Sequence, residues 1–160
     1  MNKDKSHIKL SYIAPFYFDK KDASLLFDLL KTYQSYSEDV LDVIQFVFVD
    51  DASPIEYEIP IFNLNILCVE VLDNIQWNNP GARNLGVVCS KSDKVLISDI
   101  DHEFPEETLR AIIRMKECGR KFFRIRRKQY DGSALGAHPN TFVMSRARFL
   151  RLYGYDEEFC

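Results

Sequence analysis

Two aspartates, Asp99 and Asp101, are separated by Ile100 and come just after the apolar run Val95-Leu96-Ile97, with Ser98 between the run and Asp99. Such a run is typical of a buried strand, so we expect both carboxylates at the C-terminal end of that strand. Two acidic oxygen donors in this position suit a hard divalent cation that also holds phosphate oxygens. The triplet Asp99-Ile100-Asp101 therefore indicates a site for the diphosphate of a nucleotide.

Polar or turn-forming residues follow two other strand-like runs in the same way. Asp50-Asp51 ends the β-branched and aromatic run 44–49, and Pro15-Phe16 ends the run 8–14. Ligands of parallel α/β sheets bind beyond the C-terminal ends of the strands, so we expect the three strand ends to form one rim. The sequence contains neither a G-x-G-x-x-G fingerprint nor a P-loop, which excludes the two common phosphate-binding loops.

The elements that must position these residues alternate between strand and helix. Strands are predicted over 8–14, 44–49, 64–71, 94–98, 122–127 and 141–144. Helices are predicted over 23–35, over 81–90 with Asn79 as the cap, from Pro105 to a stop at Gly119, and over 145–153. This alternation predicts an α/β fold with a mostly parallel sheet and helices on both faces, in a single domain over residues 1–160.

Composition sets the class of protein. The chain has 160 residues, of which 46% are hydrophobic and 28% charged, as expected for a soluble globular domain. A net charge of −3 gives no argument for nucleic acid or for an acidic membrane surface. We find no apolar run long enough for a transmembrane helix, and no signal peptide in residues 1–9. Four scattered cysteines look like reduced thiols, so we expect a cytoplasmic protein.

Five segments together resemble the family-2 glycosyltransferases, which have the Rossmann-like GT-A fold, and they stand in the order of that family. Residues 12–18 resemble the opening strand and nucleotide loop, 48–54 the "VDDGS" turn, 81–86 the "ARNxG" helix, 97–102 the DxD metal site, and 154–159 the acceptor-side "GGFDE" segment. The resemblance implies a metal-dependent, inverting transfer of a sugar from a nucleotide-diphosphate donor, a UDP-sugar, to a saccharide or glycolipid. The resemblance also implies a role in surface-polysaccharide synthesis. The expected location is the cytoplasm, with peripheral attachment to the inner face of the membrane as the alternative.

The resemblance also implies roles for individual residues. The nucleotide-sugar site would consist of Ala14, Pro15, Phe16, Asp50, Asp51, Arg83, Asp99, Ile100 and Asp101. Backbone at 14–16 would line the base, Asp51 would accept hydrogen bonds from uracil or ribose, and Arg83 would reach the base or a phosphate. Asp101 would ligate Mn²⁺ or Mg²⁺, with Asp99 close to the ion and His102 as a further ligand or hydrogen-bond partner.

The catalytic base is left unassigned by the resemblance. The family usually places it in a Glu-Asp pair shortly after the "GGFDE" segment, and this sequence stops at Cys160 before such a pair. Asp156 and Glu157 are the weak candidates that remain. We therefore expect a piece of a longer enzyme, whose exposed edge favours self-association. The alternatives are a nucleotide-sugar-binding module without transferase activity and a sugar-phosphate nucleotidyltransferase, although the Gly-rich basic loop that the latter needs near Pro15 is missing.

Simpler interpretations of the same residues stay open. Asp50-Asp51 can be only a turn, Asp99-Ile100-Asp101 can cap the following helix, and Arg83 can be a surface cation. His138 lies in the Gly-rich loop 132–140, where plain exposure is favoured over a ligand role. Residues 120–128 are rich in Arg and Lys. We interpret this run as a solvated strand face rather than as a site for phosphates or an anionic acceptor.

Overall fold

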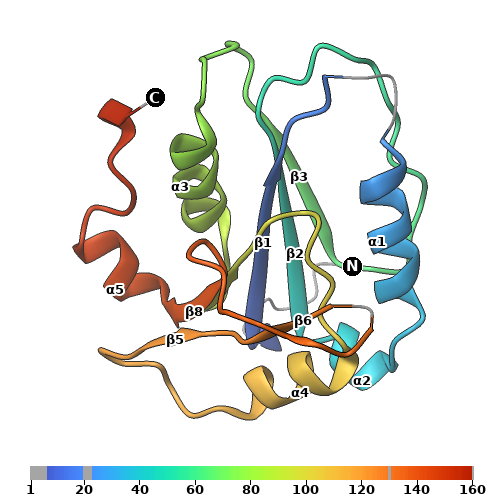
Figure 1. The fold of residues 1–160 in the computed structure, drawn as a ribbon, viewed down its shortest axis with the longest axis vertical. Helices are drawn as coiled ribbons and strands as arrows, with labels where there is room; N and C mark the ends of the chain where they lie inside the picture. Colours follow the sequence, from blue (N-terminus) through green and yellow to red (C-terminus); the bar gives the residue numbers. More distant parts are fainter. Residues whose placement is uncertain (1–6, 20–22, 130, 160) are drawn as a thin grey trace.

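The computed structural model describes residues 7–19, 23–129 and 131–159. A six-stranded sheet with the order β3-β2-β1-β4-β8-β5 forms its centre (Figure 1). Its strands are β1 (Leu10–Phe16), β2 (Ile44–Asp50), β3 (Ile66–Glu70), β4 (Lys94–Ile97), β8 (Phe142–Ser145) and β5 (Phe122–Arg124). The first four pair in parallel, and β8 runs antiparallel to both β4 and β5. The prediction of a mostly parallel α/β sheet is confirmed.

Helices cover both faces of this sheet, as the sequence predicted. They are α1 (Ser24–Gln34), α2 (Glu38–Leu41), α3 (Asn79–Cys89), α4 (Glu106–Arg114), α5 (Arg146–Arg151) and the 3-10 turn η2 (Glu157–Phe159). Figure 1 shows α1 and α3 on opposite sides of the strands. One core joins the sheet to α1, α2 and α4, and a second core joins it to α3 and α5. A separate two-stranded sheet pairs β6 (Arg127–Lys128) with β7 (Ala134–Leu135).

Helix α3 approaches the sheet closely because Gly86 lacks a side chain. A Cβ at this position would lie 2.4 Å from Cγ2 of Ile13 and 3.3 Å from Cγ2 of Val49. Ala82 and Val87 on the same side of the helix are fully buried. The predicted cap of this helix is one residue wrong, since the capping position is Asn78 and Asn79 is already helical.

Pro15 does not end the first strand, which is a correction to the sequence prediction. Strand β1 continues to Phe16 and pairs with β2 along its whole length, whereas its register with β4 ends at Ile13. Ser98 donates to the Ile13 carbonyl, so backbone groups of alternate residues from Ile13 onward face β4. The nitrogen of Pro15, which carries no hydrogen, therefore faces the β4 side of the strand, where pairing has already ended, so no ladder hydrogen bond is lost.

Two predicted ends near the C-terminal half are also wrong. Helix α4 stops at Arg114, well before Gly119, which instead lies in the turn that Lys121 closes by donating to the Cys118 carbonyl. The predicted strand 122–127 is split, because Phe122–Arg124 joins the main sheet and Arg127–Lys128 pairs with β7. Among the described residues, none of the helices combines the length and apolar character needed to cross a bilayer.

Candidate metal and nucleotide site

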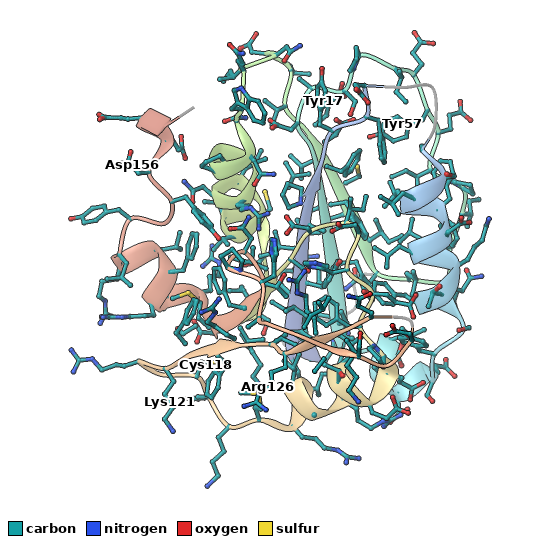
Figure 2. All side chains as sticks on the ribbon, in the orientation of Figure 1. Tyr17, Tyr57, Cys118, Lys121, Arg126 and Asp156 are labelled. Atoms are coloured by element: carbon teal, nitrogen blue, oxygen red, sulfur yellow. The ribbon has the colours of Figure 1, made fainter. Side chains whose placement is uncertain are left out.

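The C-terminal ends of β1, β2 and β4 meet at one rim of the sheet. Phe16 lies opposite Asp50 in the register, and Asp51 donates its N–H to the Phe16 carbonyl at 2.9 Å. Ser98, directly before Asp99, bonds to β1 in the same way. Figure 2 shows Tyr17 and Tyr57 at the end of the molecule where β1 and β2 finish. The backbone of Ala14, Pro15 and Phe16 lies in the buried final part of β1.

Asp50 organises the loop that follows β2. Its side chain is buried and accepts hydrogen bonds from the backbone N–H of Ser53 at 2.8 Å and from the Tyr57 hydroxyl at 2.5 Å. Burial and the neighbouring Asp50 raise the pKa of Tyr57 far above its ordinary value, so this phenol stays a donor. Asp50 thus orders residues 51–57, and its predicted place in the nucleotide-sugar site stays a prediction.

Asp51 is half-buried and held by Asn78. The Asn78 amide donates to Oδ1 of Asp51 at 2.7 Å, and burial raises the pKa of the Asp51 carboxyl. The residues beside this pair, Ala52 and Trp77, have backbone φ values of 60° and 61°, which residues other than glycine rarely adopt. Gly81 leaves room for Asn78, because a Cβ there would lie 2.2 Å from the Asn78 Oδ1. The pair is therefore a built connection between the β2 loop and the start of α3.

Arg83 is 1% exposed, which rules out the interpretation as a surface cation. Its guanidinium forms an ion pair with Asp99 and donates to the Asn79 side chain at 2.5 Å and to the Asn140 carbonyl at 3.2 Å. The Tyr155 ring lies over the same group, 5.8 Å from Cζ to the ring centre. Arg83 thus positions Asp99, while its predicted contact with a base or phosphate stays a prediction.

Asp99, His102 and His138 form the group with metal-ligand geometry. Each offers one ligand atom, and these atoms all lie within 4.8 Å of one another. Oδ2 of Asp99 is 3.1 Å from Nδ1 of His138. Two ligands that each lie about 2.1 Å from one ion, at a right angle, are about 3 Å apart, so this spacing fits a shared ion. Two imidazoles with one carboxylate suit a transition metal better than Mg²⁺.

His102 is fixed from both sides of its ring. Nδ1 lies 2.9 Å from the Thr141 hydroxyl, and Nε2 lies 3.2 Å from Nη1 of Arg127. Burial lowers the pKa of His102, which favours the neutral imidazole that metals bind. The Asp101 carboxylate lies 3.9 Å from Nε2, with 67% of its side chain exposed, and stands outside the three-residue group. Its role as a metal ligand stays a prediction.

The expectation that His138 is simply exposed is wrong. It is half-buried against Asp99, and its ring centre lies 5.0 Å from that of His102. The antiparallel pairing of β8 with β4 places Phe142 opposite Ile97, so the loop before β8 arrives where β4 ends. That strand direction was the missing signal, since sequence patterning alone gives no direction for a short strand.

Asn84, next to Arg83, anchors the C-terminal segment and was not singled out from the sequence. Its amide donates to the Tyr155 carbonyl at 2.9 Å and to Glu157 at 2.6 Å, and its oxygen accepts from the Tyr155 N–H at 2.9 Å. The two candidate bases, Asp156 and Glu157, are exposed, and Figure 2 shows Asp156 on the outer side of α3. Arg83 and Asn84, which are neighbours in the motif of residues 81–86, thus hold Asp99 and the C-terminal segment around Tyr155 in place.

A cleft of about 960 Å³ opens beside Asp101 and His102. Its walls come from the segment that leads into α4 and from the residues around β6 and β7. The residues lining it are Asp101, His102, Glu103, Phe104, Pro105, Glu107, Thr108, Ile125, Arg126, Arg127, Lys128, Gln129, Asp131, Leu135 and Thr141. The metal-ligand group therefore borders a space large enough for a small ligand.

No protein-family model matches the sequence, and a search of curated proteins returned no match. Solved structures do match. TarS 1–349 of S. aureus in complex with UDP-GlcNAc aligns with a TM-score of 0.70 and 18% identity, over 94% of this chain and 49% of that chain. The mannosyltransferase PcManGT of Pyrobaculum calidifontis, in complex with GDP-Man and Mn²⁺, aligns with a TM-score of 0.64 and 17% identity, over 97% and 50%.

The chain spans about half the length of each of these two structures. At identities below one fifth, the likeness establishes the fold and leaves the activity to be argued from the site. The GT-A fold predicted from the sequence is confirmed.

Proposed function

We propose that this chain is the nucleotide-sugar-binding domain of a family-2, metal-dependent, inverting glycosyltransferase that uses a UDP-sugar. The observation that carries the proposal is the group of Asp99, His102 and His138 at the sheet rim that also presents Asp51. A cation site beside a half-buried hydrogen-bond acceptor provides for both ends of a nucleoside diphosphate. The GT-A fold, shared with structures that contain UDP-GlcNAc or GDP-Man with Mn²⁺, supports the proposal.

The donor would lie across the strand ends. Asp51 accepts the imino N–H of uracil, and the backbone of residues 14–16 lines the base. The diphosphate reaches Asp99, His102 and His138, with Asp101 at the exposed side. A bound Mn²⁺ would offset the charge of the departing diphosphate. Arg83 holds the Asp99 carboxylate toward this site through their ion pair.

The transfer itself is a single displacement at the anomeric carbon. The acceptor hydroxyl oxygen bonds to this carbon from the face opposite the diphosphate, the carbon–oxygen bond to the diphosphate breaks, and its electron pair leaves with UDP. The hydroxyl proton passes to a carboxylate base, for which Asp156 and Glu157 are the candidates in this chain. A saccharide or glycolipid acceptor would enter through the cleft beside Asp101 and His102. The reaction would belong to surface-polysaccharide synthesis and would take place in the cytoplasm.

A second candidate function is nucleotide-sugar binding without transfer. It is favoured by the exposed positions of Asp156 and Glu157 and by the bond from Asn84 that engages the Glu157 carboxylate. A base needs a fixed carboxylate directed at the acceptor hydroxyl, whereas Asp156 stands at the outer side of α3 and Glu157 is bonded to Asn84 of that helix.

Titration calorimetry with UDP, GDP, CDP and ADP, each with Mn²⁺ and with a chelator, tests the donor site. We expect UDP to bind most tightly and only with Mn²⁺. Asp99→Asn and His138→Gln should each weaken the Mn²⁺-dependent binding at least ten-fold, because each removes one ligand. The exposed Asp131→Asn is the matched control and should bind like the parent. Equal UDP affinity in chelator would overturn the metal role.

Product analysis with UDP-sugars then separates the two candidate functions. Release of UDP in the presence of saccharide acceptors, with a product of inverted anomeric configuration, would support transfer. Metal-dependent donor binding without any turnover would instead support the binding module.

A further inference from the structure

Arg127 occupies the side of His102 that faces the cleft. Its Nη1 lies 3.2 Å from Nε2 of His102, and its Nε donates to the Gly136 carbonyl at 3.2 Å. Arg127 is half-buried and pairs with Leu135 in the β6–β7 sheet. One guanidinium, carried by β6, thus connects a residue of the metal-ligand group to Gly136, which directly follows β7 in the segment that leads to His138.

The hydrogen bonds settle which nitrogen of His102 carries the proton. A guanidinium can only donate, so Nε2 of His102 must be the accepting nitrogen. The proton of the neutral ring is then on Nδ1, which donates to the Thr141 hydroxyl at 2.9 Å. This tautomer is the one in which a hydrogen bond at Nδ1 orients Nε2 as a metal ligand. The lone pair that a cation needs is therefore the one that Arg127 holds.

We propose that a divalent cation and Arg127 compete for Nε2 of His102, so that metal binding releases Arg127 into the cleft. This inference rests on the proposed function only in taking Asp99, His102 and His138 as the metal ligands. A cation at Nε2 excludes the Arg127 hydrogen bond sterically and repels the guanidinium. The released side chain stays beside the carboxylates of Asp101 and Glu103, which line the same cleft.

The competition couples the metal to the hairpin. Arg124 donates to the Ala137 carbonyl at 3.0 Å and Arg127 to that of Gly136, so these two bonds hold the segment that precedes His138. Within the described residues, the β6–β7 register has only two residue pairs. A cation at Nε2 displaces Nη1 of Arg127, so this short sheet loses its link to His102 and the cleft wall rearranges as the metal enters.

Calorimetric titration of the metal-free chain with Mn²⁺ alone tests the competition. Arg127→Leu and Arg127→Gln should each bind Mn²⁺ about two- to ten-fold more tightly than the parent. This factor in the dissociation constant corresponds to the free energy of one hydrogen bond, which the variants no longer have to break. Arg126→Leu is the matched control, because Arg126 is a neighbouring, exposed residue of the same charge that lines the same cleft. It should bind Mn²⁺ within about two-fold of the parent, and circular dichroism should verify the fold of every variant.

Hydrogen exchange gives an independent measurement. Mn²⁺ should speed amide exchange in β6 and β7 of the parent, whereas in Arg127→Leu this exchange should be fast already without metal. Unchanged or weaker Mn²⁺ binding by both Arg127 variants would overturn the competition while leaving the metal site intact. Equal gains from Arg126→Leu would show a general charge effect and also overturn it. Absence of Mn²⁺ binding in all chains would overturn the metal role in the proposed function as well.

Discussion

Asp51 is the residue whose protonation should report on nucleotide binding. Burial raises the pKa of this carboxyl above its ordinary 3.8. Only the ionised form has both oxygens free of protons to accept from uracil N3–H, so UDP affinity should fall as the pH drops through this raised pKa. The loss should therefore begin at a higher pH than for an ordinary aspartate. Calorimetry with UDP and Mn²⁺ between about pH 4 and pH 7 measures it.

The control for this prediction is Asp51→Asn. Protonation of the phosphates and of the metal ligands affects parent and variant alike, so the ratio of their UDP affinities isolates Asp51. We expect the ratio to shrink toward one in acid. A ratio that is constant over the whole range would show that Asp51 does not contact the base. Asn78→Ala, which removes the 2.7 Å hydrogen bond to Asp51, should lower UDP affinity with little effect on binding of Mn²⁺ alone.

Individual residues of the candidate site could be predicted from the sequence only where they lie at the ends of strands. Asp51 directly follows β2 and Asp99 lies two residues after β4, so residue type and local pattern were enough to locate them. His138 and Asn84 depend on which segments the fold brings together. Their roles follow from the direction of β8 and from the docking of the C-terminal segment on α3, and local pattern contains neither fact.

Helix α4 shows why element ends escape such prediction. Its last carbonyls are satisfied by a residue distant in sequence, since the Lys94 ammonium donates to Ile112 at 2.8 Å, Ile113 at 3.1 Å and Met115 at 2.6 Å. A cation placed there also favours the negative end of the helix dipole. Gly119 offered the usual local stop signal, but this tertiary cap ends the helix earlier.

Lys94→Met should therefore destabilise the fold by about 1–3 kcal/mol, because it leaves three carbonyls without their charged donor. Urea denaturation followed by far-ultraviolet circular dichroism measures the loss. Lys116→Met is the matched control, as Lys116 is an exposed lysine just beyond the same helix, and it should change the unfolding free energy by less than about 0.5 kcal/mol. Equal effects of the two substitutions would refute the capping role.

At the scale of the whole molecule, one sheet separates two apolar cores and presents the candidate site at one rim. Tyr12 and Phe46 pack toward α1, whereas the adjacent Ile13 and Val47 pack toward α3. The alternation of strands and helices along the sequence was sufficient to predict this layered arrangement. Because the same strands carry both cores and end at Asp51 and Asp99, loss of either core should disorganise the site. The single domain over residues 1–160 stays a prediction that unfolding can test.

If the two cores form one cooperative unit, a cavity on one face must lower protection on the other. Val87→Ala, in the α3 core, should cost about 2 kcal/mol. Cys118 lies in the opposite core with 2% exposure, so pulse labelling of its thiol in urea reports on that face. We expect Val87→Ala to shift the labelling midpoint of Cys118 as far as it shifts the circular dichroism midpoint, in a Cys68→Ser, Cys89→Ser and Cys160→Ser background. Leu26→Ala, on the Cys118 side, is the positive control. Protection of Cys118 that is unchanged by Val87→Ala would mean that the two faces unfold separately, because only a shared sheet transmits the loss from one core to the other.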